Sequence, residues 1–184
     1  LPGQRVILFP SNGNGMAEYL VEPPDRLVHL PDDGELENWV MCQHMGTILY
    51  GISRLGDVVG KRIAVLGQGA IGLGFTNFLS RMNIAELITT DLLDYRLDLS
   101  KRLGATYTVN AGREDSVEVI REITKGEGAD IVIEAAGKSV TARQALFAAK
   151  LSGMVEYFGV PHDDVFPYDF RHFWDQQLTL ISTS

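Results

Sequence analysis

Cysteine is nearly absent from the sequence: Cys42 is the only one in 184 residues. A single cysteine excludes a disulfide within the chain, excludes a Cys-x-x-Cys zinc site, and fits a reducing compartment. Long apolar runs are also missing, because no stretch approaches the roughly 20 residues that a membrane-spanning helix needs. The chain does not open with a basic segment followed by an apolar one, which is the pattern of a signal peptide. We therefore expect a cytoplasmic location and no membrane partner.

Positive charge is scarce as well: 16 lysines and arginines stand against 24 acidic residues, which gives a formal net charge of −8. A surface this acidic repels phosphate backbones, so we expect no nucleic-acid partner. The remaining composition, with 45% hydrophobic and 22% charged residues, is that of an ordinary globular α/β protein. The length suffices for one well-buried domain and a smaller appendage.

The beginning of the chain reads as short β segments. Arg5–Phe9 and Met16–Val21 are strand-like, and turn-forming residues separate them. This part is too small to bury a core by itself, and the chain opens on Leu1 inside what reads as a strand, so we expect further chain upstream. A helical pattern follows over Glu35–Leu55.

Beyond this helix, apolar strands alternate with helices, the pattern typical of a parallel sheet that is covered on both faces. The predicted strands are 62–66, 85–90, 106–109, 129–133, 154–158 and 177–182, and the predicted helices are 70–82, 95–103, 116–124 and 140–150. We predict an α/β fold with a doubly wound, parallel six-stranded sheet and right-handed crossovers. The chain then divides into a β remnant with its linking helix at 1–45 and a main domain at 46–184.

The first strand of the main domain runs directly into Gly67-Gln68-Gly69-Ala70-Ile71-Gly72, which matches G-x-G-x-x-G. Gly67 permits a tight turn, Gly69 lets a pyrophosphate approach the backbone, and Gly72 lets the helix pack closely on the strand. The helix that begins near Ala70 directs free N–H groups at the phosphates. This context of strand, loop and helix predicts a Rossmann dinucleotide site, whereas a mere strand-to-helix turn is the alternative.

An acidic residue, Asp91, ends the second strand nineteen positions after Gly72. A carboxylate there accepts hydrogen bonds from the adenosine ribose and repels a 2′-phosphate, which favours NAD over NADP. Asp91 serving only as the cap of the next helix is the alternative. Arg96 either bonds the same ribose or is a solvated helix charge.

The residues that carry a family resemblance occur in order along nearly the whole chain: Gly15-Met16-Ala17-Glu18-Tyr19, Asp25-Arg26-Leu27-Val28-His29-Leu30-Pro31, Gly46-Thr47-Ile48-Leu49-Tyr50, Ile63–Gly72, Arg96-Leu97, Leu103-Gly104-Ala105, Gly128-Ala129-Asp130, Glu134-Ala135-Ala136-Gly137 and Phe158-Gly159-Val160. With them the chain resembles the medium-chain dehydrogenase/reductase superfamily, of the zinc-containing alcohol dehydrogenase type. The resemblance implies an NAD-binding domain preceded by the end of a GroES-like catalytic domain.

The same resemblance implies contacts with the nicotinamide half of the cofactor. Ala136 and the run Phe158-Gly159-Val160 sit at carboxyl ends of strands, where such contacts are made in the family. Thr47 matches a helix-start position near the nicotinamide. Plain turn chemistry is the alternative for the two loops.

Zinc is the main departure from the family pattern. Full-length relatives carry catalytic zinc on residues upstream of this chain, so the resemblance implies zinc only in the full-length parent. Cys42 and His44 lie near the place of a third ligand, but residues i and i+2 of a helix point about 200° apart and cannot share one metal. We expect neither metal ligands nor catalytic residues here, and structural or surface roles for Cys42, His29, His44, His162 and His172.

The sequence thus predicts part of an oxidoreductase that transfers a hydride between NAD and a small-molecule alcohol, polyol or carbonyl substrate, with this chain alone inactive. A zinc-free quinone or enoyl reductase of the same superfamily is one alternative, and a non-catalytic dinucleotide-binding module is another. The apolar last strand, Gln177–Ser182, is predicted to pair with a second copy as a homodimer. Phe173 and Trp174 either supply aromatic contacts to that interface or cover the sheet of a monomer.

Overall fold

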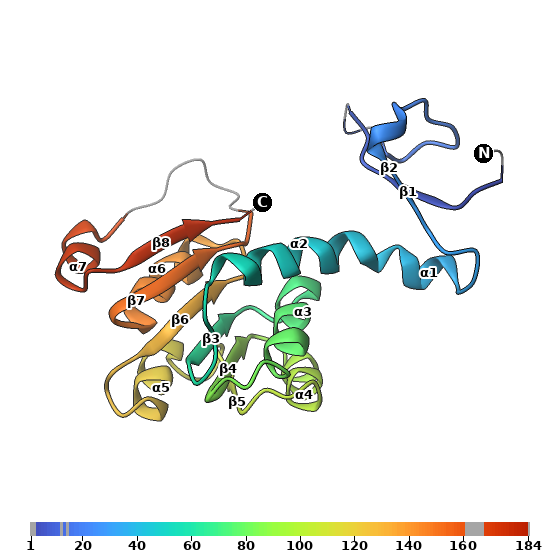
Figure 1. Ribbon diagram of the computed structural model, residues 1–184. Helices are drawn as coiled ribbons and strands as arrows, with labels where there is room; N and C mark the ends of the chain where they lie inside the picture. The colour runs from blue at the N-terminus through green and yellow to red at the C-terminus, as the bar shows by residue number, and fades with distance from the viewer. Residues whose placement is uncertain (1–2, 12, 14, 161–167, 184) are drawn as a thin grey trace. The chain divides into compact units, whose positions relative to one another are not determined.

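The structure is a computed structural model that describes residues 3–11, 13, 15–160 and 168–183. The chain divides into two compact units, Leu1–Gly46 and Thr47–Ser184. Among the described residues, no helix is long and apolar enough to cross a bilayer. Figure 1 labels the helices and strands of both units, which we describe one at a time.

The first unit holds a two-stranded antiparallel sheet of β1 (Val6–Leu8) and β2 (Leu27–His29), with a short 3-10 helix at Pro24–Arg26 and helix α1 at Leu36–Trp39. The prediction of a strand at Met16–Val21 is wrong. Met16 and Val21 are fully exposed, and no strand among the described residues pairs with this segment. β-prone composition alone does not form a strand when no partner strand satisfies its backbone.

The predicted single helix over Glu35–Leu55 is two helices, α1 and α2 (Met41–Arg54), with a turn at Val40 between them. The indole nitrogen of Trp39 donates to the carbonyl oxygen of Asp33 at 2.9 Å and ties the end of α1 back onto the preceding turn. Thr47 is the seventh residue of α2, so its prediction as a helix-start position is wrong.

The second unit contains the predicted six-stranded parallel sheet, in the order β5-β4-β3-β6-β7-β8. The strands are β3 (Arg62–Leu66), β4 (Glu86–Asp91), β5 (Tyr107–Asn110), β6 (Ala129–Glu134), β7 (Ala149–Tyr157) and β8 (Thr179–Ser182). The predicted doubly wound fold is confirmed. The middle strands β3 and β6 pair directly, with Leu66 opposite Glu134, so the loops that follow them begin side by side.

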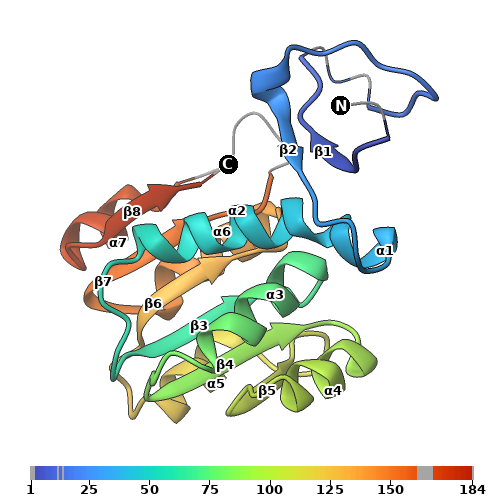
Figure 2. The same cartoon turned by 45° about the vertical axis from the view of Figure 1, so that its right-hand side comes forward.

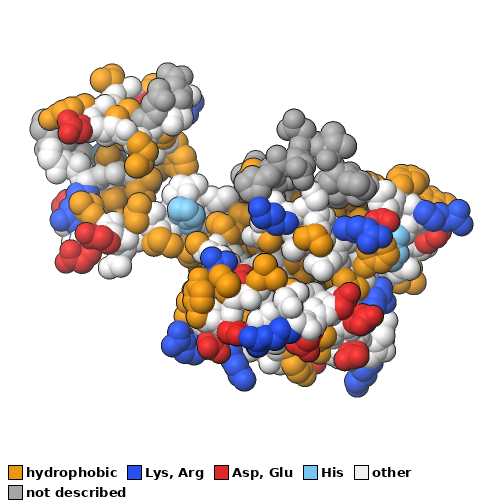
Figure 3. Space-filling model, turned by 180° about the vertical axis from the view of Figure 1, so that it is seen from behind, with side chains coloured by type: hydrophobic (Ala, Val, Ile, Leu, Met, Phe, Trp, Pro, Cys, Tyr) orange, Lys and Arg blue, Asp and Glu red, His pale blue; other side chains and the backbone are white. Residues whose placement is uncertain are grey.

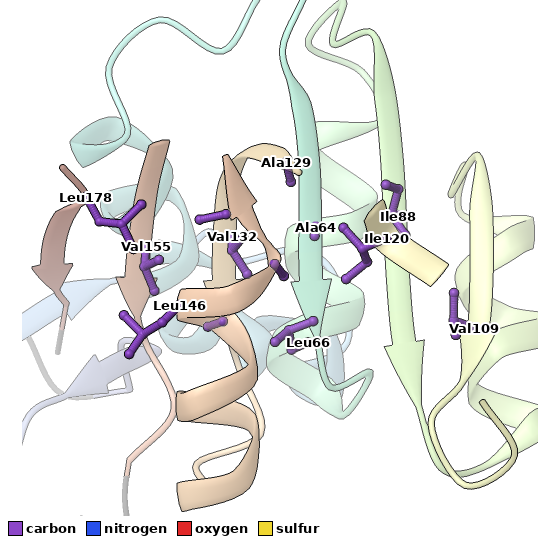
Figure 4. Packing of buried hydrophobic residues seen from close by; sticks show 13 residues of the cluster. Ala64, Leu66, Ile88, Val109, Ile120, Ala129, Val132, Leu146, Val155 and Leu178 are labelled. Atoms are coloured by element: carbon purple, nitrogen blue, oxygen red, sulfur yellow. The ribbon is translucent and has the colours of Figure 1, made fainter. Parts of the chain in front are cut away.

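Helices cover both faces of this sheet, as Figures 1 and 2 show. They are α3 (Ala70–Leu79), α4 (Asp94–Arg102), α5 (Ser116–Ile123), α6 (Ser139–Ala148) and the short α7 (Phe170–Asp175). Helix α3 contacts α4, and α5 contacts α6. Figure 4 shows the core between the sheet and α5 and α6, where side chains such as Leu66, Ile120 and Leu146 are almost completely buried.

The C-terminal strand β8 lies at the edge of the sheet beside β7. Its predicted start at Gln177 is wrong, because Gln177 has a φ of 52° and so belongs to a turn before the strand. Phe173 packs against the core cluster and covers the sheet, whereas Trp174 is 65% exposed. His162 lies outside the described residues, while His172 stacks on Phe147 with 4.0 Å between the ring centroids.

Charged side chains of both signs are interspersed over the surface of the second unit that Figure 3 shows. No broad basic field is visible on that face.

Candidate functional site

The candidate site lies at the carboxyl edge of the sheet, where the strand order reverses between β3 and β6. Loops that leave two such strands in opposite directions create a crevice between them. Here the crevice is a cavity of about 480 Å³. Its wall includes Gly67 and Gly69 after β3, Asp91 at the end of β4, and Ala136 after β6.

The three glycines of the loop after β3 differ in what surrounds them. Gly67 has a φ of +95°, a conformation that L side chains rarely adopt. A Cβ on Gly72 would overlap the carbonyl oxygen of Gly67. A Cβ on Gly69 would meet nothing within 4 Å. The fold itself therefore requires glycine at Gly67 and Gly72, whereas at Gly69 the fold leaves the space above the backbone open.

Helix α3 begins directly behind this open space. Gly69 is its N-cap residue and, being glycine, has no side chain to cap the N–H groups of the first turn. Exposed Ala70 and half-buried Ile71 form its first turn. The first N–H groups of a helix have no partner within the helix, so this turn can donate to an anion placed over Gly69.

Gln68 acts within the loop in a way that the motif alone does not reveal. Its side chain is fully buried, with Oε1 accepting from the Thr76 hydroxyl at 2.9 Å and Nε2 donating to the Gly67 carbonyl oxygen at 3.0 Å. Thr76 belongs to α3, so these bonds tie the loop to the helix that follows it. The loop is therefore held in shape before any ligand arrives.

Asp91 is buried, with its side chain 7% exposed, and it joins β4 to the glycine loop. Its Oδ2 accepts from the backbone N–H of Gln68 at 2.7 Å, and its Oδ1 accepts from that of Leu93 at 3.0 Å. The alternative that Asp91 caps the next helix is wrong, because the N-cap residue of α4 is Leu93. Asp91 thus presents a fixed carboxylate at the cavity wall.

Arg96 lies beside this carboxylate, with its Nη1 3.6 Å from Oδ2 of Asp91. Its Nε donates to the Tyr95 hydroxyl at 3.2 Å. The Tyr95 hydroxyl, and then the Asp91 carboxylate, raise the pKa of the Arg96 guanidinium above its ordinary value. Arg96 also lines the cavity, so its side chain is not simply a solvated helix charge.

The loop after β6 is organised by Glu134, which the sequence analysis did not single out as a site residue. Its side chain is buried, and its Oε1 accepts from the backbone N–H groups of Ala136 and Gly137, both at 2.9 Å, and from the Thr141 hydroxyl at 2.7 Å. An acidic residue that ends the apolar strand Ala129–Glu134 is a signal that could have identified it.

The run Phe158-Gly159-Val160 follows β7, next to the loop after β6. The Phe158 ring is buried and meets the Phe75 ring edge-on at 4.9 Å, so the side chain belongs to the core beneath α3. Val160 is 82% exposed. Ala136 lines the cavity, whereas Thr47 and this run lie outside its wall.

Zinc does not fit the described residues. Cys42 and His44 are both exposed on α2. Among the described residues, no group of three or more histidine, cysteine or acidic side chains is placed to hold a metal ion. We therefore derive no chemical step through zinc from this chain.

Comparison with known proteins settles the family. The model of the family described as zinc-binding dehydrogenase matches residues 70–184. The chain belongs to this family. The match begins at the first residue of α3 and continues through α4 to α7 and strands β4 to β8. The resemblance to zinc-containing alcohol dehydrogenases is thereby confirmed.

Individual members of the zinc-binding dehydrogenase family match over most of this chain. An L-threonine 3-dehydrogenase from Caldanaerobacter subterraneus is 32% identical over 167 residues, which are 91% of this chain and 48% of the relative. A Bacillus subtilis sorbitol dehydrogenase is 24% identical and covers 97% of this chain and 51% of its own length. The chain spans about half the length of the curated relatives it matches.

A solved structure supports the same placement. The alcohol dehydrogenase TADH from Thermus sp. ATN1 has a TM-score of 0.78 at 27% identity, over 85% of this chain and 45% of that one. A dehydrogenase of this family uses a dinucleotide cofactor, and the cavity at the reversal between β3 and β6 lies where this fold binds one.

Proposed function

We propose that this chain is the NAD-binding part of an oxidoreductase that transfers a hydride between NAD and the carbon of an alcohol or polyol. One observation carries the proposal. The cavity at the strand reversal is walled by a glycine whose backbone is open to a ligand, Gly69, and by a buried carboxylate, Asp91. The names of two relatives, L-threonine 3-dehydrogenase and sorbitol dehydrogenase, favour a small substrate that carries hydroxyl groups.

In this proposal the pyrophosphate lies over Gly69 and accepts hydrogen bonds from the first turn of α3, at Ala70 and Ile71. The positive end of the helix dipole adds to the attraction of the phosphate charge. Gly67 and Gly72 act through shape, since the turn and the close packing of α3 depend on them.

The nicotinamide half then lies towards Ala136 and Phe158-Gly159-Val160. Ala136 is exposed on the cavity wall, and Val160 is exposed beside it. Because the ring of Phe158 is buried against Phe75, Phe158 offers the cofactor only its backbone. Thr47, half-buried in α2, is proposed to contribute to the same half of the site.

NAD rather than NADP is proposed because of Asp91. Both of its oxygens are held by backbone N–H groups, so the carboxylate cannot swing away from a 2′-phosphate. Arg96, 3.6 Å away, offsets the charge of Asp91, so the pair as a whole presents no net positive charge to a 2′-phosphate. Two negative groups in contact at a partly buried site repel each other strongly.

The cofactor supplies the hydride chemistry when it is bound, and this chain binds and orients the cofactor. The titratable side chains on the cavity wall are Asp91, Arg96 and Lys138. Lys138 directly follows the proposed nicotinamide loop 135–137, whereas Asp91 and Arg96 lie on the adenosine side. We also propose that the chain alone is inactive, and that the catalytic groups belong to a fuller enzyme whose GroES-like domain ends in residues 1–45; in support, the chain spans about half the length of the relatives it matches.

A homodimer through β8 is part of the proposal. The strand lies at the sheet edge, where unpaired backbone groups are available to a second copy. Trp174, which is 65% exposed just before it, supplies an aromatic surface. A cytoplasmic location is proposed from the single cysteine.

Titration of the chain with NADH and with NADPH, followed by fluorescence, tests the cofactor assignment. We expect NADH to bind at least about tenfold more tightly, which corresponds to about 1.4 kcal/mol. Equal affinities would overturn the preference for NAD, and the absence of binding by either would overturn the function itself.

The variant Asp91→Ser sharpens this test. It removes the carboxylate but also two acceptors that hold the loop, so both affinities are expected to fall. Damage to the loop lowers the affinities for NADH and NADPH alike, whereas loss of the repulsion raises only the affinity for NADPH. The ratio of the two affinities is therefore the informative quantity. Asp98→Ser, at an exposed position of α4 away from the cavity wall, is the control with the same charge change.

A further inference from the structure

Three loops meet at the carboxyl edge of the sheet, and Glu134 lies where they join. The backbone N–H of Ala135 donates to the carbonyl oxygen of Leu66 at 2.9 Å, which joins the loop after β6 to the start of the glycine loop. The carbonyl oxygen of Glu134 accepts from the N–H groups of Phe158 at 3.0 Å and Gly159 at 2.8 Å. The main chain of Glu134 thus connects the loop after β6 to the loop after β7.

The side chain of Glu134 fixes the first of these two loops. Its Oε1 takes the N–H groups of Ala136 and Gly137 and the hydroxyl of Thr141, a residue in the first turn of α6. The carboxyl group is therefore an acceptor for three donors from a single buried position. Without an acceptor there, buried N–H groups would be left unpaired, and unpaired buried donors are costly.

The contact between the two loops leaves no room for side chains. A Cβ on Gly159 would come within 2.5 Å of Oε2 of Glu134, and it would overlap the backbone nitrogen of Gly137. Gly137 itself has a φ of +65°, and a Cβ there would overlap the carbonyl oxygen of Val160. The loops after β6 and β7 therefore lie backbone against backbone, with the Glu134 carboxyl group filling the space behind them.

The sheet consists of two halves, β3-β4-β5 and β6-β7-β8, and a fold of this kind holds one nucleotide over each half. Asp91 and the glycine loop belong to the first half. The second nucleotide of the proposed cofactor then lies over the ends of β6 and β7, where Ala136 lines the cavity. The loops that Glu134 fixes are the ones that this nucleotide would meet.

We infer that Glu134 is a positioning residue for the nicotinamide ring of the dinucleotide: it fixes the loop 135–137 against the loop 158–160 without touching the cofactor. This inference rests on the proposed function. The adenosine half, which lies by Asp91 and the glycine loop, does not depend on it.

The test compares two ligands on the unmutated chain and on two variants of Glu134. ADP-ribose contains the adenosine, pyrophosphate and second ribose of the cofactor but lacks the nicotinamide, whereas NADH contains all four parts. Glu134→Leu removes the acceptor at similar size, and Glu134→Gln keeps an acceptor oxygen in place of Oε1. Affinities are measured by calorimetry, and the emission of bound NADH reports the surroundings of the nicotinamide.

For Glu134→Leu we expect the affinity for NADH to fall about tenfold, because the N–H groups of Ala136 and Gly137 lose their acceptor, while the affinity for ADP-ribose changes by less than about twofold. The emission of bound NADH is expected to approach that of free NADH. For Glu134→Gln both affinities and the emission are expected to stay close to those of the unmutated chain.

An equal loss of affinity for both ligands in Glu134→Leu would overturn the inference, since it would indicate general damage to the site. Unchanged NADH binding would overturn it as well. If circular dichroism shows that Glu134→Leu does not fold, Glu134→Asp replaces it: this variant keeps the carboxylate but withdraws it by one methylene from the N–H groups of Ala136 and Gly137, and it is expected to weaken the binding of NADH but not that of ADP-ribose. Failure of the unmutated chain to bind either ligand would overturn the proposed function instead.

Discussion

A single methyl group added at two glycines of the same loop should have opposite consequences for folding and for binding. The two variants are Gly69→Ala and Gly72→Ala, which change the same residue type three positions apart. Gly69 has a φ of −69° and a ψ of −168°, an extended conformation that alanine adopts without strain. Its Cβ would meet nothing within 4 Å, whereas a Cβ on Gly72 would overlap the carbonyl oxygen of Gly67.

The expected loss of stability follows from these contacts. A Cβ on Gly72 would also lie 2.8 Å from the carbonyl carbon of Gly67, where an ordinary carbon–carbon contact is about 3.5–4.0 Å. The neighbour is backbone of a turn that Asp91 and Thr76 hold, so it cannot move aside cheaply. Overpacking of this kind costs about 3 kcal/mol, which lowers the Tm of a chain of this size by about 6–12 °C.

Gly69→Ala should leave the fold intact and even raise its stability slightly, by about 0.4–1 kcal/mol, because alanine has fewer conformations to lose on folding. Its methyl group, however, occupies the space proposed for the pyrophosphate. Loss of one charge-assisted hydrogen bond costs about 1.5–3 kcal/mol, so the affinity for NADH should fall about tenfold to a hundredfold.

Thermal unfolding followed by circular dichroism and titration with ADP-ribose measure the two effects separately. ADP-ribose is the suitable ligand because it contains the pyrophosphate and depends on no contact of the nicotinamide. Unchanged ADP-ribose binding by Gly69→Ala, together with a native spectrum, would refute the assignment of this loop as the phosphate site. An unchanged Tm of Gly72→Ala would refute the packing argument.

Two further predictions concern stability and assembly. Burial raises the pKa of the fully buried Glu156, and the opposing effects of Thr183 and Arg54 only partly offset this. The folded state therefore loses stability as the pH rises above the ordinary pKa of 4.5 and through the raised pKa of the folded state. The variant Glu156→Gln does not titrate at this position, so it should raise the Tm at pH 8 by about 2–4 °C for each kcal/mol that ionisation of Glu156 costs. At pH 4 the increase in Tm should be smaller, and an equal increase at both pH values would contradict this prediction. In sedimentation at micromolar concentration we expect a dimer that Thr179→Lys, at an exposed position of the edge strand β8, shifts towards monomer; a monomeric unmutated chain would exclude the β8 dimer.

The middle of the sheet was predictable because β3, β4 and β6 are almost completely buried, and β3 and β6 are nearly continuous apolar runs. Arg62–Leu66 is predicted with the bounds that the structure has, and β4, β5, β6 and β8 lie within two residues of their predicted ends. The start of β7 is predicted wrongly: the strand begins at Ala149, five residues before the predicted Met154, so Ala149 and Lys150 belong to β7 and not to the predicted helix 140–150. A parallel sheet needs helical crossovers, and alternation of strand and helix leaves few other topologies. The glycine loop was predictable for a related reason, since Gly67 and Gly72 are required by backbone geometry that follows from a strand-to-helix turn.

The first unit was less predictable because its side chains are not buried. Met16–Val21 has the composition of a strand, but its side chains face solvent and it lacks a pairing partner among the described residues.

A strand boundary in the second unit has a similar cause. The apolar composition predicts that the last strand begins at Gln177, but Gln177 has a φ of 52° and lies in the turn before the strand. In both places the deciding quantity is a backbone partner or a dihedral angle, which composition does not encode.

Asp91 and Glu134 show the same limit at the site itself. Each carboxylate ends an apolar strand and accepts two backbone N–H groups: Glu134 from the loop that follows it, and Asp91 from the loop that follows it and from the glycine loop. The spacing from the glycine motif drew attention to Asp91 as a group that faces the ligand, and nothing in that spacing pointed to Glu134. Because Asp91 also holds the glycine loop through Gln68, cofactor choice and loop geometry depend on one side chain. A change of affinity in an Asp91 variant therefore measures both, and only the ratio between NADH and NADPH isolates the charge.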